Sequence, residues 1–175
     1  MVLYFISGGP GHGKTKLVEE LFHMGYNVIP EAAREIAETD ERFKGKDIGK
    51  IFDKRLFQDE IFNLQKKMME SVQIGDSDLF FCDRSFPDNV AYYRHNGLIV
   101  PKELLAWAYK FKSTAFILDS LDNHEFDSLR TESSEERMKI HNEIIRAYEE
   151  FRYRIIYVPK MSVEKRAKFV LEKVV

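Results

Sequence analysis

The chain has 175 residues, of which 44% are hydrophobic and 32% charged, an ordinary composition for a globular protein with charge on the high side. Its 29 acidic and 27 basic residues nearly cancel to a formal net charge of −2, which removes the simplest argument for a nucleic-acid partner, a globally basic surface. The chain has one cysteine, no secretory signal and no apolar run near the roughly 20 residues of a membrane span, which predicts a cytoplasmic protein without a membrane partner. Its length predicts a single domain over residues 1–175, and its oligomeric state is left open.

Short apolar runs alternate with segments of helical periodicity along the whole chain. Continuous apolar runs, which predict buried strands, occupy residues 2–7, 26–30, 79–82, 114–118 and 154–158. Apolar spacing predicts helices over residues 14–23, 31–38, 48–72 and 87–95, and start signals predict three more that begin near Pro101, Ser133 and Ser162. This alternation predicts an α/β fold: a three-layer α/β/α domain with a parallel five-stranded sheet.

One motif lies between the first predicted strand and the first predicted helix. Eight consecutive residues satisfy G-x-x-x-x-G-K-[ST], namely Gly8, Gly9, Pro10, Gly11, His12, Gly13, Lys14 and Thr15. With average residue frequencies, a chain of this length matches the pattern by accident about one time in a hundred. The strand before it and the helix after it are the context that a phosphate-binding loop requires, so the motif predicts binding of ATP or another nucleoside triphosphate.

The residue types in this loop each have a physical reason. Glycines allow positive φ, so that successive N–H groups point into one anion-sized hollow, and the dipole of the next helix adds positive charge. Lys14 is expected to reach the β- and γ-phosphates, while the Thr15 hydroxyl coordinates Mg²⁺. The nucleotide-binding set extends to Lys16, and His12 occupies a variable position to which no catalytic role is assigned.

Charged residues end the third predicted strand. In a parallel sheet, ligands gather where the carboxyl ends of the strands meet. Asp83 follows an apolar run and is interpreted as a Mg²⁺ ligand opposite Thr15, with a turn or helix-cap aspartate as the alternative. Arg84 is then expected beside the transferred phosphate, against the alternative of an exposed surface arginine.

Polar residues also follow the second predicted strand. Glu31 is a candidate general base that takes a proton from an acceptor hydroxyl, and Arg34 is a candidate clamp for an acidic acceptor. As an alternative, both are ordinary polar residues in the first turns of a helix. Asp88, four residues after Arg84, either contributes to the same site or caps the helix that follows, and we favour the cap.

These features resemble a known group of proteins. The loop is similar to that of nucleoside and nucleoside-monophosphate kinases, and Glu31 with Asp83-Arg84 is similar to deoxyribonucleoside and thymidylate kinases. More closely, the chain resembles the ribosylnicotinamide kinase domain and a family of small predicted ATPases that is called "AAA domain" but belongs with the kinases, over residues 6–11, 28–34 and 83–88. The resemblance implies that Glu31 acts as base and that Asp83 holds the metal beside a phosphate-binding Arg84. Ala32 and Ala33 follow Glu31 where deoxyribonucleoside kinases have Pro-Val.

Kinases of this kind close a lid over the phosphates to exclude water. The predicted lid is the acidic segment at about residues 119–134, between the fourth strand and the capped helix. Arg130 within it, or Arg137 after it, is expected to reach the γ-phosphate as an internal arginine finger. For each of the two, a solvated surface arginine is the alternative.

Together these features predict an enzyme that moves the γ-phosphate of ATP, with Mg²⁺, to a small nucleoside-, nucleotide- or vitamin-like acceptor. One alternative is a nucleotide-driven ATPase or switch that acts on a protein partner, and a less favoured one is a kinase of nucleic-acid ends. The chain lacks the Asn-Lys-x-Asp string that reads guanine in GTPase switches. In the long predicted helix, Phe52, Phe57 and Phe62 are assigned to the core, with the lining of an acceptor pocket as the alternative.

Overall fold

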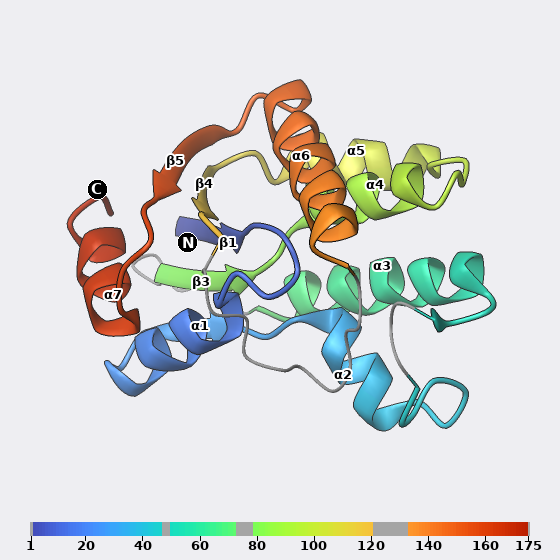
Figure 1. Ribbon diagram of the computed structural model, residues 1–175, viewed down its shortest axis with the longest axis horizontal. Coiled ribbons are helices and arrows are strands. Elements are labelled where there is room, and N and C mark those ends of the chain that lie inside the picture. Colours follow the sequence, from blue (N-terminus) through green and yellow to red (C-terminus); the bar gives the residue numbers. More distant parts are fainter. Residues whose placement is uncertain (1, 47–49, 73–78, 121–132, 175) are drawn as a thin grey trace.

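The computed structural model describes residues 2–46, 50–72, 79–120 and 133–174. Its sheet has five strands in the order β2-β3-β1-β4-β5, and every pairing is parallel (Figure 1). The strands are β1 (Val2–Ser7), β2 (Asn27–Ile29), β3 (Leu79–Asp83), β4 (Thr114–Leu118) and β5 (Arg154–Val158). The predicted parallel five-stranded sheet is therefore confirmed, with β1 at its centre.

Helices connect the strands, as right-handed crossovers in a parallel sheet require. They are α1 (Lys14–His23), α2 (Ala32–Thr39), α3 (Lys54–Ser71), α4 (Phe86–His95), α5 (Lys102–Lys110), α6 (Ser134–Glu150) and α7 (Val163–Leu171). Among the described residues, no helix is long and apolar enough to cross a membrane.

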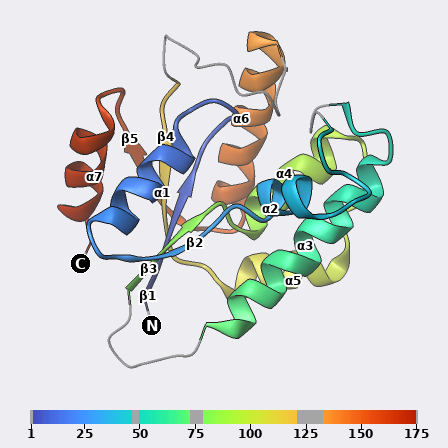
Figure 2. The same ribbon diagram turned by 90° about the horizontal axis from the view of Figure 1, so that it is seen from below.

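The helices cover both faces of the sheet (Figure 2). Alternate residues of a strand point to opposite faces. In β1, Tyr4 and Ile6 pack into a cluster with α1 and α7, whereas Leu3 and Phe5 pack into a larger cluster with α3, α4, α5 and α6. A third cluster joins α2 to α3. These layers confirm the three-layer α/β/α prediction.

The long helix α3 begins later than its apolar spacing predicts. Asp53 caps it, since its carboxylate accepts a hydrogen bond from the Leu56 N–H at 2.9 Å, which satisfies one of the free N–H groups of the first turn. Phe52 lies before this cap and is fully exposed, so its assignment to the core is wrong, whereas Phe57 and Phe62 are buried. Residues 47–49, which include the predicted start of the helix, lie outside the described residues.

Candidate active site

The register of the strands brings the loops of the candidate site together. Ile6 of β1 pairs with Asp83 of β3, and Ile29, the last residue of β2, pairs with Cys82 of β3. The Arg84 N–H donates to Ile6 O at 3.0 Å, which extends the ladder beyond β3. The phosphate loop, the Glu31 turn and the Asp83-Arg84 turn are therefore neighbours at the carboxyl edge of the sheet, where the parallel arrangement predicted that ligands gather.

The phosphate loop has the backbone conformation that its glycines permit. Gly8, Gly11 and Gly13 have φ values of 136°, 76° and 81°, which L side chains rarely adopt. A Cβ on Gly8 would also lie only 2.9 Å from the carbonyl oxygen of Leu118. Gly13 is the N-cap of α1, so the free N–H groups of the first turn lie at the end of the loop. The result is an anion-binding hollow at a helix N-terminus.

The side chains of the loop differ in burial. Lys14 is buried, and its Nζ donates to the carbonyl oxygen of Gly9 at 2.8 Å. Pro10 is buried as well, whereas Gly11 and the side chain of Lys16 are exposed. Lys14 thus already lies across the loop. Because the side chain of Lys16 is exposed, its predicted contact with the nucleotide is assigned to its backbone N–H.

Thr15 and Asp83 lie together, as the metal assignment requires. The Thr15 hydroxyl donates to Asp83 Oδ2 at 3.2 Å. Mg²⁺ commonly takes one or two protein oxygens and completes its shell with water and substrate phosphates. Within the described residues, no group of three His, Cys, Asp or Glu side chains could hold a metal ion alone. The donor set therefore fits a Mg²⁺ that depends on bound phosphates for its remaining ligands.

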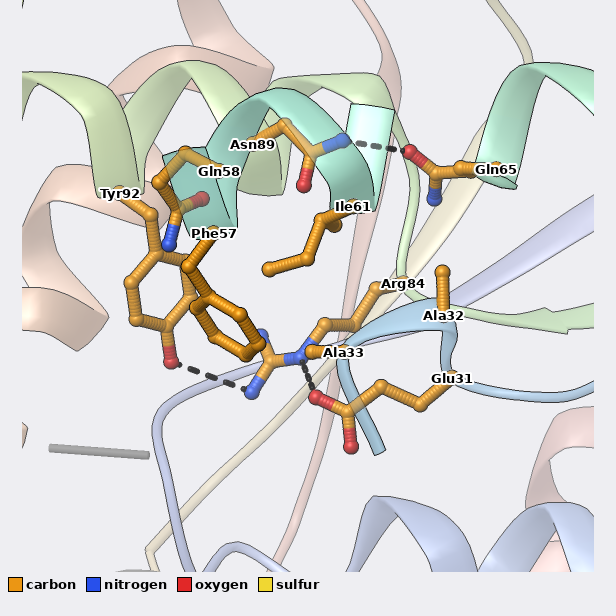
Figure 3. A pocket seen from close by; sticks show the side chains of 10 residues that line it. All are labelled: Glu31, Ala32, Ala33, Phe57, Gln58, Ile61, Gln65, Arg84, Asn89 and Tyr92. Carbon is orange, nitrogen blue, oxygen red and sulfur yellow. Dashed lines mark hydrogen bonds and ion pairs between the residues drawn. The ribbon is translucent and has the colours of Figure 1, made fainter. Parts of the chain in front are cut away.

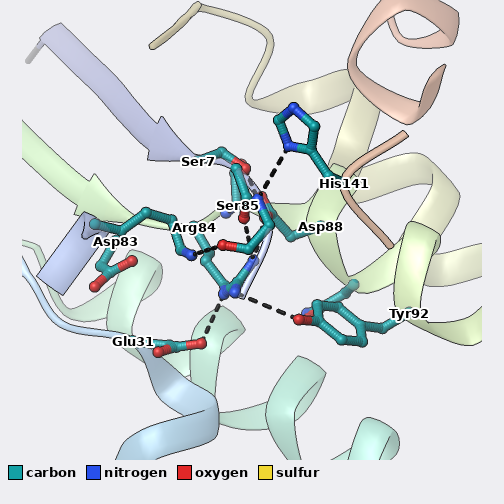
Figure 4. A network of polar contacts seen from close by, with 12 residues as sticks. Ser7, Glu31, Asp83, Arg84, Ser85, Asp88, Tyr92 and His141 are labelled. Carbon is teal, nitrogen blue, oxygen red and sulfur yellow. Dashed lines mark hydrogen bonds and ion pairs between the residues drawn. The ribbon is translucent and has the colours of Figure 1, made fainter. Parts of the chain in front are cut away.

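Arg84 is a buried arginine that is paired on two sides (Figure 4). Its Nε donates to Glu31 Oε1 at 2.6 Å and its Nη1 to Asp88 Oδ1 at 2.8 Å. Nη1 also lies 3.4 Å from Gly8 O, and Nη2 lies 3.4 Å from the Tyr92 hydroxyl. Burial opposes the charge, but Tyr92, Glu31 and Asp88 together hold the pKa of Arg84 well above its usual range. The alternative of an exposed surface arginine is therefore wrong.

Asp88 has a wider role than the cap that its position in the sequence suggested. Its Oδ2 accepts from the Ser85 N–H at 3.0 Å, as a helix cap does, and from the Tyr148 hydroxyl at 2.6 Å. Its Oδ1 accepts from Ser7 Oγ at 2.7 Å as well as from Arg84. Arg84 also has a φ of 75°, a strained value for a non-glycine residue of the kind that concentrates at functional sites. Asp88 thus holds this strained arginine in place besides capping α4.

His12 and Arg166 attach the loop to the rest of the fold. Nδ1 of His12 lies 2.9 Å from the carbonyl oxygen of Leu118, and burial lowers the pKa of this imidazole to about 3. Arg166 of α7 is buried and donates to the carbonyl oxygens of His12 at 2.7 Å and Asp119 at 3.0 Å. A guanidinium therefore lies beside the phosphate loop, bonded to its backbone. His12 has a structural contact and stays without a catalytic role.

The comparison with protein families identifies this arrangement. A family model described as "AAA domain" matches residues 3–166, which run from β1 into α7. The chain belongs to this AAA-domain family. The resemblance that residues 6–11, 28–34 and 83–88 indicated is thereby confirmed. No curated protein sequence matches the chain significantly.

Several solved structures that resemble this AAA-domain chain are kinases. The thymidylate kinase from Ehrlichia chaffeensis has a TM-score of 0.63 at 13% identity, with 98% of this chain and 96% of that chain covered. For the deoxyadenosine kinase from M. mycoides the TM-score is 0.61 at 14% identity, with 99% and 98% covered. For the shikimate kinase from Aquifex aeolicus it is 0.57 at 15% identity, with 98% and 95% covered. At these identities the likeness shows the fold, which is the predicted P-loop kinase-like fold.

Glu31 and Arg34 occupy different places in the AAA-domain chain. Arg34 lies in α2, with Nη1 3.9 Å from Glu38 Oε1, and lines a groove of about 380 Å³ together with Thr15 and Asp83. Glu31 lines both this groove and a smaller cavity, and Arg34 is not among the residues that line the smaller cavity. Of the two, only Glu31 connects the groove with the cavity.

Arg130 and most of the predicted lid at residues 119–134 lie outside the described residues. Arg137 is in the first turn of α6, and its Nη2 lies 3.4 Å from Ser134 Oγ. One helical turn further, His141 accepts a hydrogen bond from the Gly9 N–H at 3.1 Å. The arginine finger stays a prediction.

Sequence reasoning missed the contributions of Ser7, Tyr148 and His141. Each meets its partner across a long stretch of sequence, which no local motif reports. One signal was present: His141 and Tyr148 are two polar residues seven positions apart, on the apolar face of a helix. Buried polar side chains need hydrogen-bond partners, so their position indicated contacts with a polar site.

Proposed function

We propose that the chain is an ATP-dependent phosphotransferase that moves the γ-phosphate to a hydroxyl or phosphate of a small nucleoside-, nucleotide- or vitamin-like acceptor. The observation that carries this proposal is the position of Arg84, which contacts the phosphate loop at Gly8 O and also lines a separate cavity. Phosphoryl transfer depends on holding donor and acceptor in line. A charged residue shared by a phosphate loop and a neighbouring cavity suits that task, whereas simple ATP hydrolysis needs no acceptor cavity.

On the donor side, the proposed roles are positioning and charge stabilisation. The loop N–H groups and Lys14 bind the phosphates, while Thr15 and Asp83 hold Mg²⁺. When it is bound, Mg²⁺ neutralises charge on the β- and γ-phosphates. In the proposed reaction, Arg130 adds an arginine finger from the lid.

On the acceptor side, Glu31 is the proposed general base and takes the proton of the acceptor hydroxyl on its carboxylate. The 2.6 Å ion pair with Arg84 fixes the orientation of that carboxylate at the wall of the cavity. Arg34 is proposed as a clamp for an acidic acceptor that extends into the groove.

The cavity indicates an acceptor that is partly apolar and also offers a hydrogen-bonding group, because Phe57 and Ile61 line it beside polar side chains (Figure 3). Its lining includes three amide side chains, and Asn89 donates to Gln65 at 2.9 Å. Gln58 is 5% exposed, and its Oε1 has no hydrogen-bond partner among the described residues. A buried acceptor atom without a partner favours a ligand that brings a donor. The cavity volume is about 30 Å³, the space of a single water, so α2 and α3 side chains must move apart to admit an acceptor.

Gln58→Leu is expected to raise the KM of the acceptor about tenfold to a hundredfold, because a hydrogen bond to the ligand is lost in a buried site. The KM of ATP is expected to stay unchanged, since Gln58 lines the cavity and not the phosphate loop. Steady-state kinetics with each substrate varied in turn measure both. The matched control is Asn63→Leu, an exposed amide on the same helix. Equal effects of the two variants on the acceptor KM would argue against this cavity as the acceptor site.

The proposed function is tested by ATP consumption with a panel of nucleosides, nucleotides and vitamin-like alcohols, with product identified by mass spectrometry. At least one acceptor is expected to gain a phosphate and to accelerate ADP release. If no acceptor is phosphorylated and a protein partner stimulates hydrolysis instead, the kinase assignment fails and the nucleotide-driven ATPase takes its place.

A further inference from the structure

One peptide unit of the phosphate loop is held at both ends by residues distant in sequence. The carbonyl oxygen of Gly8 lies 3.4 Å from Nη1 of Arg84, and the N–H of Gly9 donates to Nδ1 of His141 at 3.1 Å. Figure 4 shows His141 on the α6 side of the loop and Arg84 on the opposite side. The loop is thus attached both to the carboxyl end of β3 and to α6.

We propose that His141 is a positioning residue of the phosphate loop, which its neutral imidazole holds in the nucleotide-binding conformation through the Gly9 N–H. This proposal rests on the proposed function in one respect: the chain must bind a nucleotide, because nucleotide affinity is one of the quantities that the experiment measures. His141 is expected to act through the loop backbone and without contact to the transferred phosphate.

The hydrogen bonds determine the protonation of both histidines in this region. An N–H can only donate, so Nδ1 of His141 carries a lone pair and its proton is on Nε2. A carbonyl oxygen can only accept, so Nδ1 of His12, 2.9 Å from Leu118 O, carries the proton. The two rings lie 4.7 Å apart between centroids. His141 is therefore neutral, and His12, whose pKa burial lowers to about 3, is neutral in the opposite tautomer.

Gly9 packs closely against both histidines because it has no side chain. A Cβ at this position would lie 2.8 Å from His12 Nε2 and 3.1 Å from the Cβ of His141. The first distance is shorter than real Cβ atoms show, so a side chain here would force the buried His12 ring to shift. The close fit means that a change at His141 acts directly on the loop backbone.

Protonation of His141 would break this arrangement. A charged imidazole has donors on both nitrogens, so an N–H would face the N–H of Gly9. The charged groups that act on His141 are Lys14 from the loop and Asp119 beyond β4, and the ring of neutral His12 lies beside it. The buried Asp88 of α4 contacts α6 at Tyr148 and is paired with Arg84. Burial and then Lys14 lower the pKa of His141, whereas Asp119 raises it. The neutral form is thus the one that this environment favours.

The sign of the pH effect follows from this direction. Because the folded pKa of His141 lies below the ordinary value of about 6.5, the unfolded chain takes up this proton first, and stability falls as the pH drops below that value. Nucleotide affinity is expected to fall at a lower pH, where the folded protein itself becomes protonated at His141. Thermal unfolding at each pH separates the two effects.

The experiment compares wild type, His141→Asn and His141→Leu from pH 8 to pH 5. Asparagine can place a carbonyl oxygen near the position of Nδ1 and does not titrate, whereas leucine removes the acceptor. The probe is the β,γ-imido analogue of ATP with Mg²⁺, titrated calorimetrically. His23→Asn, which changes an exposed histidine, is the matched control, and its nucleotide affinity is expected to change with pH as that of wild type does.

Wild-type affinity is expected to fall by up to about tenfold per pH unit below the pKa of His141. The pH-dependent loss is expected to be absent from His141→Asn, with affinity near wild type at pH 8, and His141→Leu is expected to bind about fivefold to a hundredfold more weakly throughout. The proposal is overturned if His141→Asn loses affinity with pH as wild type does, or if His141→Leu binds like wild type at pH 8.

A second measurement keeps this proposal separate from the proposed function. The amide signal of Gly9 in nucleotide-free protein is followed by NMR over the same pH range. It is expected to shift with the titration of His141 in wild type and to stay constant in His141→Asn. If the signal titrates although no nucleotide binds at any pH, the proposed function fails while the attachment by His141 stands; a Gly9 signal that is insensitive to pH in wild type overturns the attachment.

Discussion

Lys14→Ala is expected to reduce the rate of ATP turnover by at least about a hundredfold, the effect of removing a preorganised charge from a transferred group. Lys14 is 4% exposed, and its ammonium lies 2.8 Å from the carbonyl oxygen of Gly9, on the loop itself. In the proposed reaction it leaves this carbonyl for the β- and γ-phosphates, where it offsets charge in the transition state. Alanine keeps the loop glycines and their N–H groups, so nucleotide binding weakens less than turnover does.

The measurement is ADP release with the best acceptor at saturating ATP, with the thermal unfolding of each variant as the check on folding. Lys44→Ala is the matched control, because this lysine is exposed and its ion pair with Glu41 is at the surface. Turnover by Lys14→Ala within a factor of three of wild type would mean that the phosphate-loop assignment is wrong.

The parts of the fold that the sequence predicts are those that local chemistry determines. The runs at residues 2–7 and 114–118 coincide with β1 and β4, because strands buried on both faces read as continuous apolar segments. The run at residues 154–158 coincides with β5, an edge strand that is partly exposed. The conformation of the phosphate loop follows from its glycines, three of which have positive φ. Where a local cap competes with periodicity, as at Asp53, the cap determines the start of the helix.

The order of the strands and the hydrogen-bond network of the site could not be predicted. Alternation of strands and helices indicates a parallel sheet but not which strand neighbours which. Glu31 and Arg84 were identified from strand ends and Asp88 from its position four residues after Arg84, yet their ion pairs depend on side-chain directions and on the register of β3 with β1. The contact of Asp88 with Tyr148 joins α4 to α6 across a sequence separation of 60 residues. Such contacts are properties of the packed fold.

Asp88→Asn is expected to cost about 3–5 kcal/mol of stability, the range for breaking a buried ion pair by removal of one partner. Asp88 is fully buried, and its two oxygens accept from four donors. An asparagine has one acceptor oxygen, so in either orientation its NH₂ group faces one group that can only donate, the Arg84 guanidinium or the Ser85 N–H, and Arg84 loses one of its two ion pairs. For a chain of this size, the expected decrease in Tm is about 6–20 °C.

The same substitution is expected to lower kcat, because Arg84 loses the carboxylate that fixes its Nη1 beside the phosphate loop. A displacement of a catalytic-site group such as the Arg84 guanidinium by about 1 Å can lower the rate about a hundredfold. The decrease in kcat is therefore expected at temperatures well below the Tm of the variant, where the protein is folded. Differential scanning calorimetry and kinetics at 15 °C measure the two effects separately. Asp40→Asn, which removes a partly exposed carboxylate bonded to Arg42 at the surface, is expected to change neither. A lower Tm with unchanged kcat would mean that Asp88 stabilises the packing of α4 and α6 alone. A decrease in both Tm and kcat is expected, because the ion pairs among Glu31, Arg84 and Asp88 lie between the phosphate loop and the acceptor cavity and would then support the loop during transfer.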